Sequence, residues 1–147
     1  MKCAYCGSNK TEVFNSRTTR SGTQIWRRRR CTDCDETMTS YERIDLQQVL
    51  SIDTGKLKKQ RYSRPKLYVS LLRAFEGGAK LDSVDAIIDT IEQRLLSLNK
   101  EIITLSELSD AVLRTIKPVD TVAFMKYLAN HSDLSGTREL NKVIKKY

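Results

Sequence analysis

Four cysteines in two close pairs constrain this chain of 147 residues more than any other feature. Cys3 and Cys6 lie in the stretch CAYC, Cys31 and Cys34 lie in CTDC, and 24 residues separate the pairs. Two intervening residues let a tight turn direct both sulfurs of a pair at one ion, and the separation suffices for a hairpin. Zinc prefers four such ligands in a tetrahedron. The sequence therefore predicts a structural zinc centre that has no open position for catalysis.

The alternative interpretation of a CxxC pair is a thioredoxin-like redox site. That interpretation requires a βαβ pattern around the motif, which this segment lacks. The amino end, MKCAYCG, has no apolar run that would serve as a signal-peptide core, so we expect a cytoplasmic, reducing location in which disulfides are rare. A bound metal would supply much of the folding free energy of a segment of about 45 residues.

The stretch that connects the two cysteine pairs has the pattern of a β-hairpin. TEVFNSR (11–17) and TQIWRRRR (23–30) are two predicted strands joined across Ser21 and Gly22, and MTSYERI (38–44) is a third. Residues 1–46 are accordingly predicted to form a small zinc ribbon of antiparallel β-structure.

Positive charge is concentrated on the second of these strands. Four consecutive arginines precede Cys31, and no acidic residue lies between positions 13 and 32. Because alternate side chains of a strand share a face, the guanidinium groups flank the metal centre on both faces. We expect them to bind nucleic-acid phosphates with a strong salt dependence, although a solubilising basic strand is the alternative. The expected contacts are Arg17, Arg20, Arg27, Arg28, Arg29, Arg30 and Trp26, which either stacks on a base or sugar or fills the core.

A second basic stretch follows the ribbon. Residues 47–75 carry seven Lys/Arg against one acidic residue, within a formal net charge of +8 for the chain. VLSIDTGKLKKQRY (49–62) predicts two strands around a turn, and Ser63 is expected to cap a helix that ends at 77–78. Lys66 in the first turn of that helix opposes the helix dipole unless an anion binds there. Lys66 is therefore a candidate phosphate ligand or simply an exposed lysine.

The remainder of the chain is predicted to be mostly helical. Apolar residues between 87 and 98 recur at helical spacing, and residues 101–103 form an extended link or strand. Expected helix starts are Asp82, Thr104 (with Glu107 in a capping box), Asp120 and Thr137. The fold class is α+β, with a ribbon over residues 1–46 and a mostly helical domain with a small sheet over 47–147.

Signatures of catalysis are missing from the sequence. His131 is the only histidine, and neither a phosphate-binding GxxxxGK[ST] motif nor a nucleophile elbow occurs. We expect a binding protein rather than an enzyme.

These motifs together resemble the NrdR family, the zinc-ribbon plus ATP-cone repressors of bacterial ribonucleotide reductase genes. The matching stretches are CAYCG, NSRTTRSGTQIWRRRRC leading to CTDC, MTSYERI, SRPKL and DTVAFMKYLA, which span nearly the whole chain. The resemblance implies a ribbon that binds double-stranded promoter DNA. It also implies a cone that binds ATP or dATP and thereby selects between homo-oligomers, in a bacterial cytoplasm and on the nucleoid when bound to DNA.

Carried over residue by residue, the resemblance assigns the four cysteines to zinc and Arg27–Arg30 to DNA. The implied nucleotide site draws on Val49, on Lys56, Lys58 and Lys59 of the turn region, and on Lys66. Relatives usually place a Lys-Arg pair before an Asp-Gly turn, where this chain has the residues 51–55, SIDTG. Either the later lysines replace those phosphate contacts, or the nucleotide binds differently or weakly.

Two other functions remain compatible with the residues. A basic zinc ribbon would also suit an RNA-binding or ribosome-associated protein, since four arginines recognise charge before sequence. A nucleotide-activated phosphohydrolase or nuclease is the enzymatic alternative. The closed set of cysteine ligands argues against the enzyme.

Overall fold

The computed structural model describes residues 1–19, 22–55, 57–78, 83–131, 142 and 144–147. They divide into two compact units, Met1–Asp45 and Leu46–Tyr147. Within the described residues, no helix is both long and apolar enough to span a membrane.

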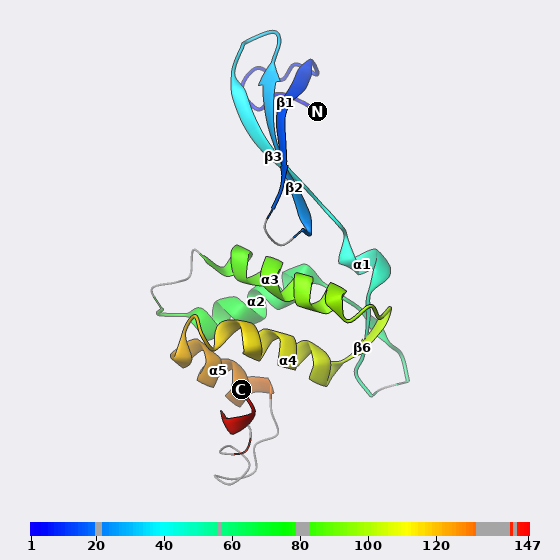
Figure 1. The fold of residues 1–147 in the computed structure, drawn as a ribbon, viewed down its shortest axis with the longest axis vertical. Helices are drawn as coiled ribbons and strands as arrows, with labels where there is room; N and C mark the ends of the chain where they lie inside the picture. Colours follow the sequence, from blue (N-terminus) through cyan, green and yellow to red (C-terminus); the bar gives the residue numbers. More distant parts are fainter. Residues whose placement is uncertain (20–21, 56, 79–82, 132–141, 143) are drawn as a thin grey trace. The chain divides into compact units, whose positions relative to one another are not determined.

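The first unit is an antiparallel sheet of three strands in the order β1-β2-β3 (Figure 1). Its strands are β1 (Thr11–Thr18), β2 (Gln24–Cys31) and β3 (Thr37–Arg43). The register between β1 and β2 shifts between Val13 and Asn15, so Phe14 is the extra residue of a β-bulge. The predicted antiparallel ribbon is confirmed. The turn residue Ser21 lies outside the described residues.

The ribbon has almost no hydrophobic core. Of its described residues, only Cys3, Gln24 and Cys31 are fully buried, whereas Val13, Phe14 and Tyr41 are exposed. A single three-stranded layer has no second layer against which it buries a face, so backbone pairing alone gives it little stability. The sheet therefore depends on a cross-link at one end.

The second unit begins with a short helix and a small mixed sheet. Its elements are α1 (Leu46–Val49), β4 (Ser51–Asp53), β5 (Gln60–Arg61) and β6 (Ile102–Thr104), with the strands in the order β5-β4-β6. β4 pairs antiparallel with β5 and parallel with β6. The predicted strand start at Val49 is wrong. The Leu50 amide donates to the Leu46 carbonyl, which closes a helical turn that buries both leucines.

Four longer helices build the rest of this unit (Figure 1). They are α2 (Arg64–Phe75), α3 (Val84–Ser97), α4 (Leu105–Ile116) and α5 (Thr121–His131). α2 packs against α3 and α5, and α4 packs against the same two helices. Their buried faces share one core that includes Leu71, Phe75, Ile88, Ile91 and Phe124.

The predicted caps account for the starts of three helices. Ser63 accepts a hydrogen bond from the Lys66 amide at the start of α2, and Asp120 accepts two from the first turn of α5. Thr104 and Glu107 form the expected capping box at α4. The predicted starts Asp82 and Thr137 lie outside the described residues. Ile144 and Tyr147 pack against the core.

Substitution Thr104→Ala tests the capping box. It removes the side-chain acceptor for the Glu107 amide, so the free energy of unfolding of the second unit should fall by about 1 kcal/mol. Urea denaturation followed by circular dichroism measures this change. Thr121→Ala is the control, because Thr121 is an exposed residue that begins α5 without capping it. Equal stability of the two variants would contradict the capping role.

Candidate functional site

The four predicted ligands converge at one end of the ribbon. All four Sγ atoms lie within 4.8 Å of one another. The separation between Cys3 and Cys34 is 3.7 Å, and that between Cys6 and Cys31 is 3.6 Å. A tetrahedron with zinc–sulfur arms of about 2.3 Å has edges of about 3.8 Å, so these separations fit a zinc ion. Sulfur-only ligation also suits zinc better than it suits magnesium or calcium.

The thiols differ in how readily they ionise. Hydrogen bonds from the backbone amides of Cys6 and Tyr5 lower the pKa of Cys3 to about 7. At Cys34 a hydrogen bond from the Glu36 backbone favours the thiolate, but burial and the neighbouring thiols outweigh it and raise the pKa to about 12. The negative charge of the thiolates that form first therefore opposes ionisation of the remaining thiols. A divalent cation would supply the missing positive charge.

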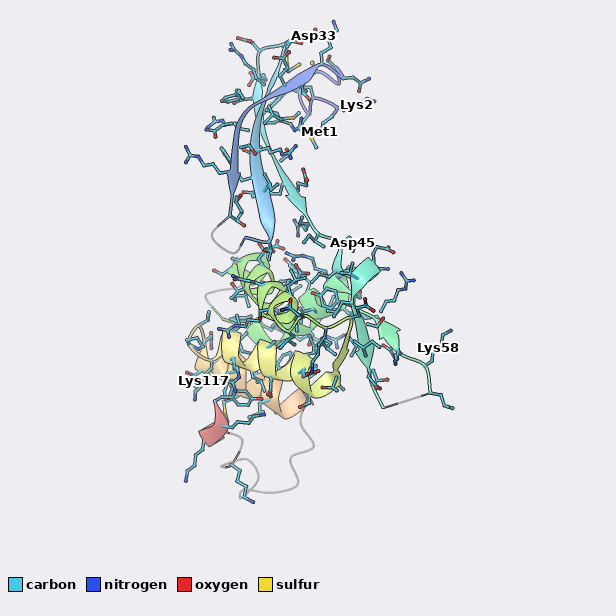
Figure 2. All side chains as sticks on the ribbon, turned by 45° about the vertical axis from the view of Figure 1, so that its right-hand side comes forward. Met1, Lys2, Asp33, Asp45, Lys58 and Lys117 are labelled. Atoms are coloured by element: carbon cyan, nitrogen blue, oxygen red, sulfur yellow. The ribbon has the colours of Figure 1, made fainter. Side chains whose placement is uncertain are left out.

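Polar contacts join the two cysteine turns. Asp33 accepts hydrogen bonds from the Ser8 hydroxyl at 2.6 Å and from Lys10 Nζ at 3.3 Å, and both residues follow the first cysteine pair. The amide of Thr32 donates to the carbonyl of Lys10 at 3.0 Å. Asp33 and Asp45 lie at opposite ends of the first unit (Figure 2). The metal centre therefore occupies the end of the ribbon that is remote from the junction with residue 46.

The strand register assigns the four arginines to two faces. On one face, Arg27 pairs with Glu42 at 2.8 Å, and Arg29 Nε donates to the Ser40 hydroxyl at 3.0 Å. These partners lie on the neighbouring strand β3. The positive charge of this face is therefore partly satisfied within the ribbon.

In the part of the chain that the structure describes, the opposite face includes two arginines with no side-chain partner, Arg17 and Arg28. Cross-strand pairing aligns Arg17 with Trp26 and Trp26 with Tyr41, and it aligns Arg28 with Thr39. Within the described residues, neither Arg17 nor Arg28 has a side-chain hydrogen bond or ion pair, and both are exposed. Trp26 is half-buried and Tyr41 is 56% exposed. We call Arg17, Trp26, Arg28 and Tyr41 the aromatic-basic face.

Two further residues that were predicted to bind DNA, Arg30 and Arg20, are not part of the aromatic-basic face. Arg30 also lies on the face of Arg28 but pairs with Asp35 at 2.5 Å. Both side chains are more than half exposed, so the pair contributes little energy and would exchange readily for a phosphate. Arg20 lies outside the described residues.

Lys66 lines two hollows of the second unit. One, of about 590 Å³, is also lined by Lys58, Lys59 and Ser63. The other, of about 810 Å³, lies between α2 and α5 and includes Arg73 and His131. Lys58 lies on the outlying connection between β4 and β5 (Figure 2). The structure thus brings three of the predicted nucleotide residues to one surface.

The remaining predicted nucleotide residues do not join this group. Val49 lines a separate hollow of about 240 Å³ with Leu96 and Asn99. Lys56 lies outside the described residues.

The sequence prediction missed a charged cluster beside Lys66. Arg64 at the start of α2 forms ion pairs with Asp85, Asp89 and Glu92 of α3. The acids are spaced by four and three residues, which is the spacing of one helical face and was visible in the sequence.

The convergent thiols and the antiparallel ribbon define a zinc-ribbon protein with a second, α+β domain. The family model described as the N-terminal domain of NrdR-like transcriptional repressors matches residues 1–42. Three relatives, each named transcriptional repressor NrdR, cover nearly the whole chain. The protein of Dechloromonas aromatica is 32% identical over 99% of this chain and 94% of its own length. The protein of Petrotoga mobilis is 33% identical over 90% of this chain and 89% of its own length. The protein of Aromatoleum aromaticum is 31% identical over 99% of this chain and 85% of its own length. The chain belongs to the NrdR family of transcriptional repressors.

Membership in this family confirms the resemblance inferred from the motifs. Because the relatives are named as repressors, the chain is a regulator rather than an enzyme.

Substitution Cys34→Ser tests the metal centre. It removes one thiolate, so the purified variant should retain much less than the one equivalent of zinc expected for the intact chain. Elemental analysis measures the metal, and the rate of thiol modification reports whether the cysteine turns have opened. Tyr5→Phe is the control, since Tyr5 lies in the other cysteine turn with an exposed side chain that is not a ligand. A Cys34→Ser variant with full zinc content would refute tetrathiolate binding.

Proposed function

We propose that this chain represses transcription by binding double-stranded promoter DNA of ribonucleotide reductase genes, under the control of ATP or dATP. In this proposal residues 1–46 bind DNA, and residues 47–147 bind the nucleotide and mediate self-association. The protein would act in the bacterial cytoplasm, on the nucleoid when DNA is bound. The observation that carries the proposal is the aromatic-basic face of the zinc ribbon.

Geometry favours this face over the other as the DNA contact. A three-stranded sheet presents one face to a duplex at a time, and β-structure is among the elements that the major groove admits. Arg17 and Arg28 need to surrender no internal partner in order to bind phosphates. Trp26 and Tyr41 add flat rings beside them that would contact sugars or bases. The opposite face would have to break the contacts of Arg27 and Arg29 first.

The small size of this DNA contact supports a control that acts through self-association. One ribbon makes few contacts and should bind weakly, whereas two ribbons held in register gain affinity through effective concentration. A nucleotide that changes self-association therefore changes promoter occupancy. By linkage, promoter DNA favours the assembly that binds it.

The surroundings of Lys66 support a phosphate site in the second unit. Lys66 is exposed at the positive end of α2, and Lys58 and Lys59 line the same hollow. Helix amino ends and lysines both attract phosphates. Hollows of this size lie in the usual range for small-molecule sites, about 300–1,000 Å³.

Arg28→Ala is the sharpest test of the DNA face, with Arg29→Ala as a control that removes the same charge from the other face. Arg28→Ala should weaken promoter binding and reduce the slope of log affinity against log salt concentration by about 1. Arg29→Ala should leave that slope nearly unchanged. Fluorescence anisotropy with a promoter duplex at several salt concentrations measures both. Equal slopes for the two variants would contradict the assignment, and preference for bulk RNA over the duplex would favour an RNA-binding function.

Lys66→Ala tests the nucleotide site. Loss of one charge-assisted contact should weaken ATP binding by about 10- to 100-fold while zinc content stays unchanged. Isothermal titration measures the affinity. Lys126→Ala is the control, because Lys126 lies on α5 and donates to the backbone carbonyl of Glu76. Unchanged affinity in Lys66→Ala would remove this lysine from the site.

A further inference from the structure

Helix α2 begins with two cations and no acid. Arg64 and Lys66 both lie in its first turn, which contains no acidic residue. Two positive charges at the positive end of a helix dipole are unfavourable unless each is compensated. Within the described residues, only Arg64 has acidic partners that compensate its charge.

Arg64 is neutralised by α3. Its guanidinium contacts Glu92 at 2.5 Å, Asp89 at 2.8 Å and Asp85 at 3.1 Å, and its side chain is only 20% exposed. Three carboxylates against one guanidinium leave this side of the helix start with an excess of negative charge. A bound anion is therefore disfavoured there.

Glu92 ties down both neighbours of the helix cap. One carboxylate oxygen accepts from the buried Tyr62 hydroxyl at 2.9 Å, and the other accepts from Arg64. Burial and the nearby Glu92 charge raise the pKa of Tyr62, so the phenol remains a donor. Tyr62 and Arg64 flank the capping residue Ser63. The start of α2 is thus held at two points by one carboxylate.

Lys66, in contrast, has no side-chain partner within the described residues. It lines the two hollows described above, and none of the three acids that contact Arg64 is among their lining residues. One cation is thereby fixed in place and the other is left available at the same helix start.

Stabilising α2 would not by itself require the ion pair between Arg64 and Glu92. Leu67 and Leu71 already bury α2 in the core. A buried ion pair usually stabilises no better than apolar packing, because removing charges from water is costly. What such a pair adds is a defined geometry, since its planar fork is satisfied in only one orientation.

We infer that Arg64 and Glu92 are positioning residues, which fix the start of α2 so that the Lys66 ammonium meets the phosphates of the bound nucleotide. This inference rests on the proposed nucleotide function and names the residues that organise its phosphate contact.

The test compares Arg64→Lys with Asp85→Asn in the full-length, zinc-loaded chain. Arg64→Lys keeps the charge that Glu92 requires but loses the fork. Asp85→Asn removes only the outermost contact, from a side chain that is 70% exposed. Isothermal titration with ATP and with adenosine, which lacks phosphates, separates phosphate positioning from base binding. Thermal melts establish that each variant is folded.

We expect Arg64→Lys to weaken ATP binding by about tenfold with little change for adenosine, and Asp85→Asn to change either by less than about twofold. Glu92→Gln should reproduce the ATP effect of Arg64→Lys. If the Arg64–Glu92 pair acts through Lys66, the double variant Arg64→Lys/Lys66→Ala should bind ATP no more weakly than Lys66→Ala alone.

Four results would overturn the inference. Wild-type affinity for ATP in folded Arg64→Lys, while Lys66→Ala is impaired, would refute the positioning role of Arg64 and leave the proposed nucleotide site standing. An equal loss for adenosine and ATP would indicate a general structural role. Additive losses in the double variant would show that Arg64 acts independently of Lys66. Failure of the intact chain to bind either ATP or dATP would refute the proposed control by a nucleotide and the inference together.

Discussion

Convergence of four thiols on one point is the constraint on which the first unit depends. The ribbon is a single sheet in which only Cys3, Gln24 and Cys31 are buried among the described residues, so apolar burial contributes little. Free thiols at separations near 3.7 Å do not hold such a sheet together, whereas metal–thiolate bonds contribute folding free energy directly. Because the metal centre stabilises the sheet, neither of its faces has to be buried in a hydrophobic core. A small domain can then carry several arginines on one strand, because metal binding offsets the destabilisation that their mutual repulsion causes.

Much of this structure was predictable because its determinants are local in sequence. Cysteine spacing predicted the metal centre, alternation and turn residues predicted the ribbon strands, and caps such as Ser63 and Thr104 predicted helix starts. Each of these rests on contacts within a few residues of the chain. The strand start predicted at Val49 was wrong because a distant contact decided the structure there. The apolar neighbours of Val49 suit a strand, but burial of Leu46 and Leu50 by the distant core closed a helical turn instead.

The properties that sequence reasoning left undecided depend on contacts distant in sequence. Four arginines in a row look equivalent until the β2–β3 register brings Glu42 to Arg27 and leaves Arg28 opposite Thr39. A shift of one residue would exchange the two faces. Likewise, the sequence around Arg64 does not indicate that the acids of the next helix will contact it. Neutralised and available cations are distinguished by pairing, not by composition.

A common physical division recurs in both units, and it bears on the proposed control by a nucleotide. In each, some cations are satisfied internally and fix the framework, while neighbouring ones remain available for an outside anion. Arg29 and Arg28 have this relation in the ribbon, and Arg64 and Lys66 have it at α2. An available cation on a fixed framework binds its anion without first losing a partner or ordering a loop, so more of the contact energy appears as affinity. A nucleotide can shift an assembly only by its difference in affinity for two states. Rigid placement of Lys66 would make that difference large, because a small displacement of the start of α2 would lose the phosphate contact.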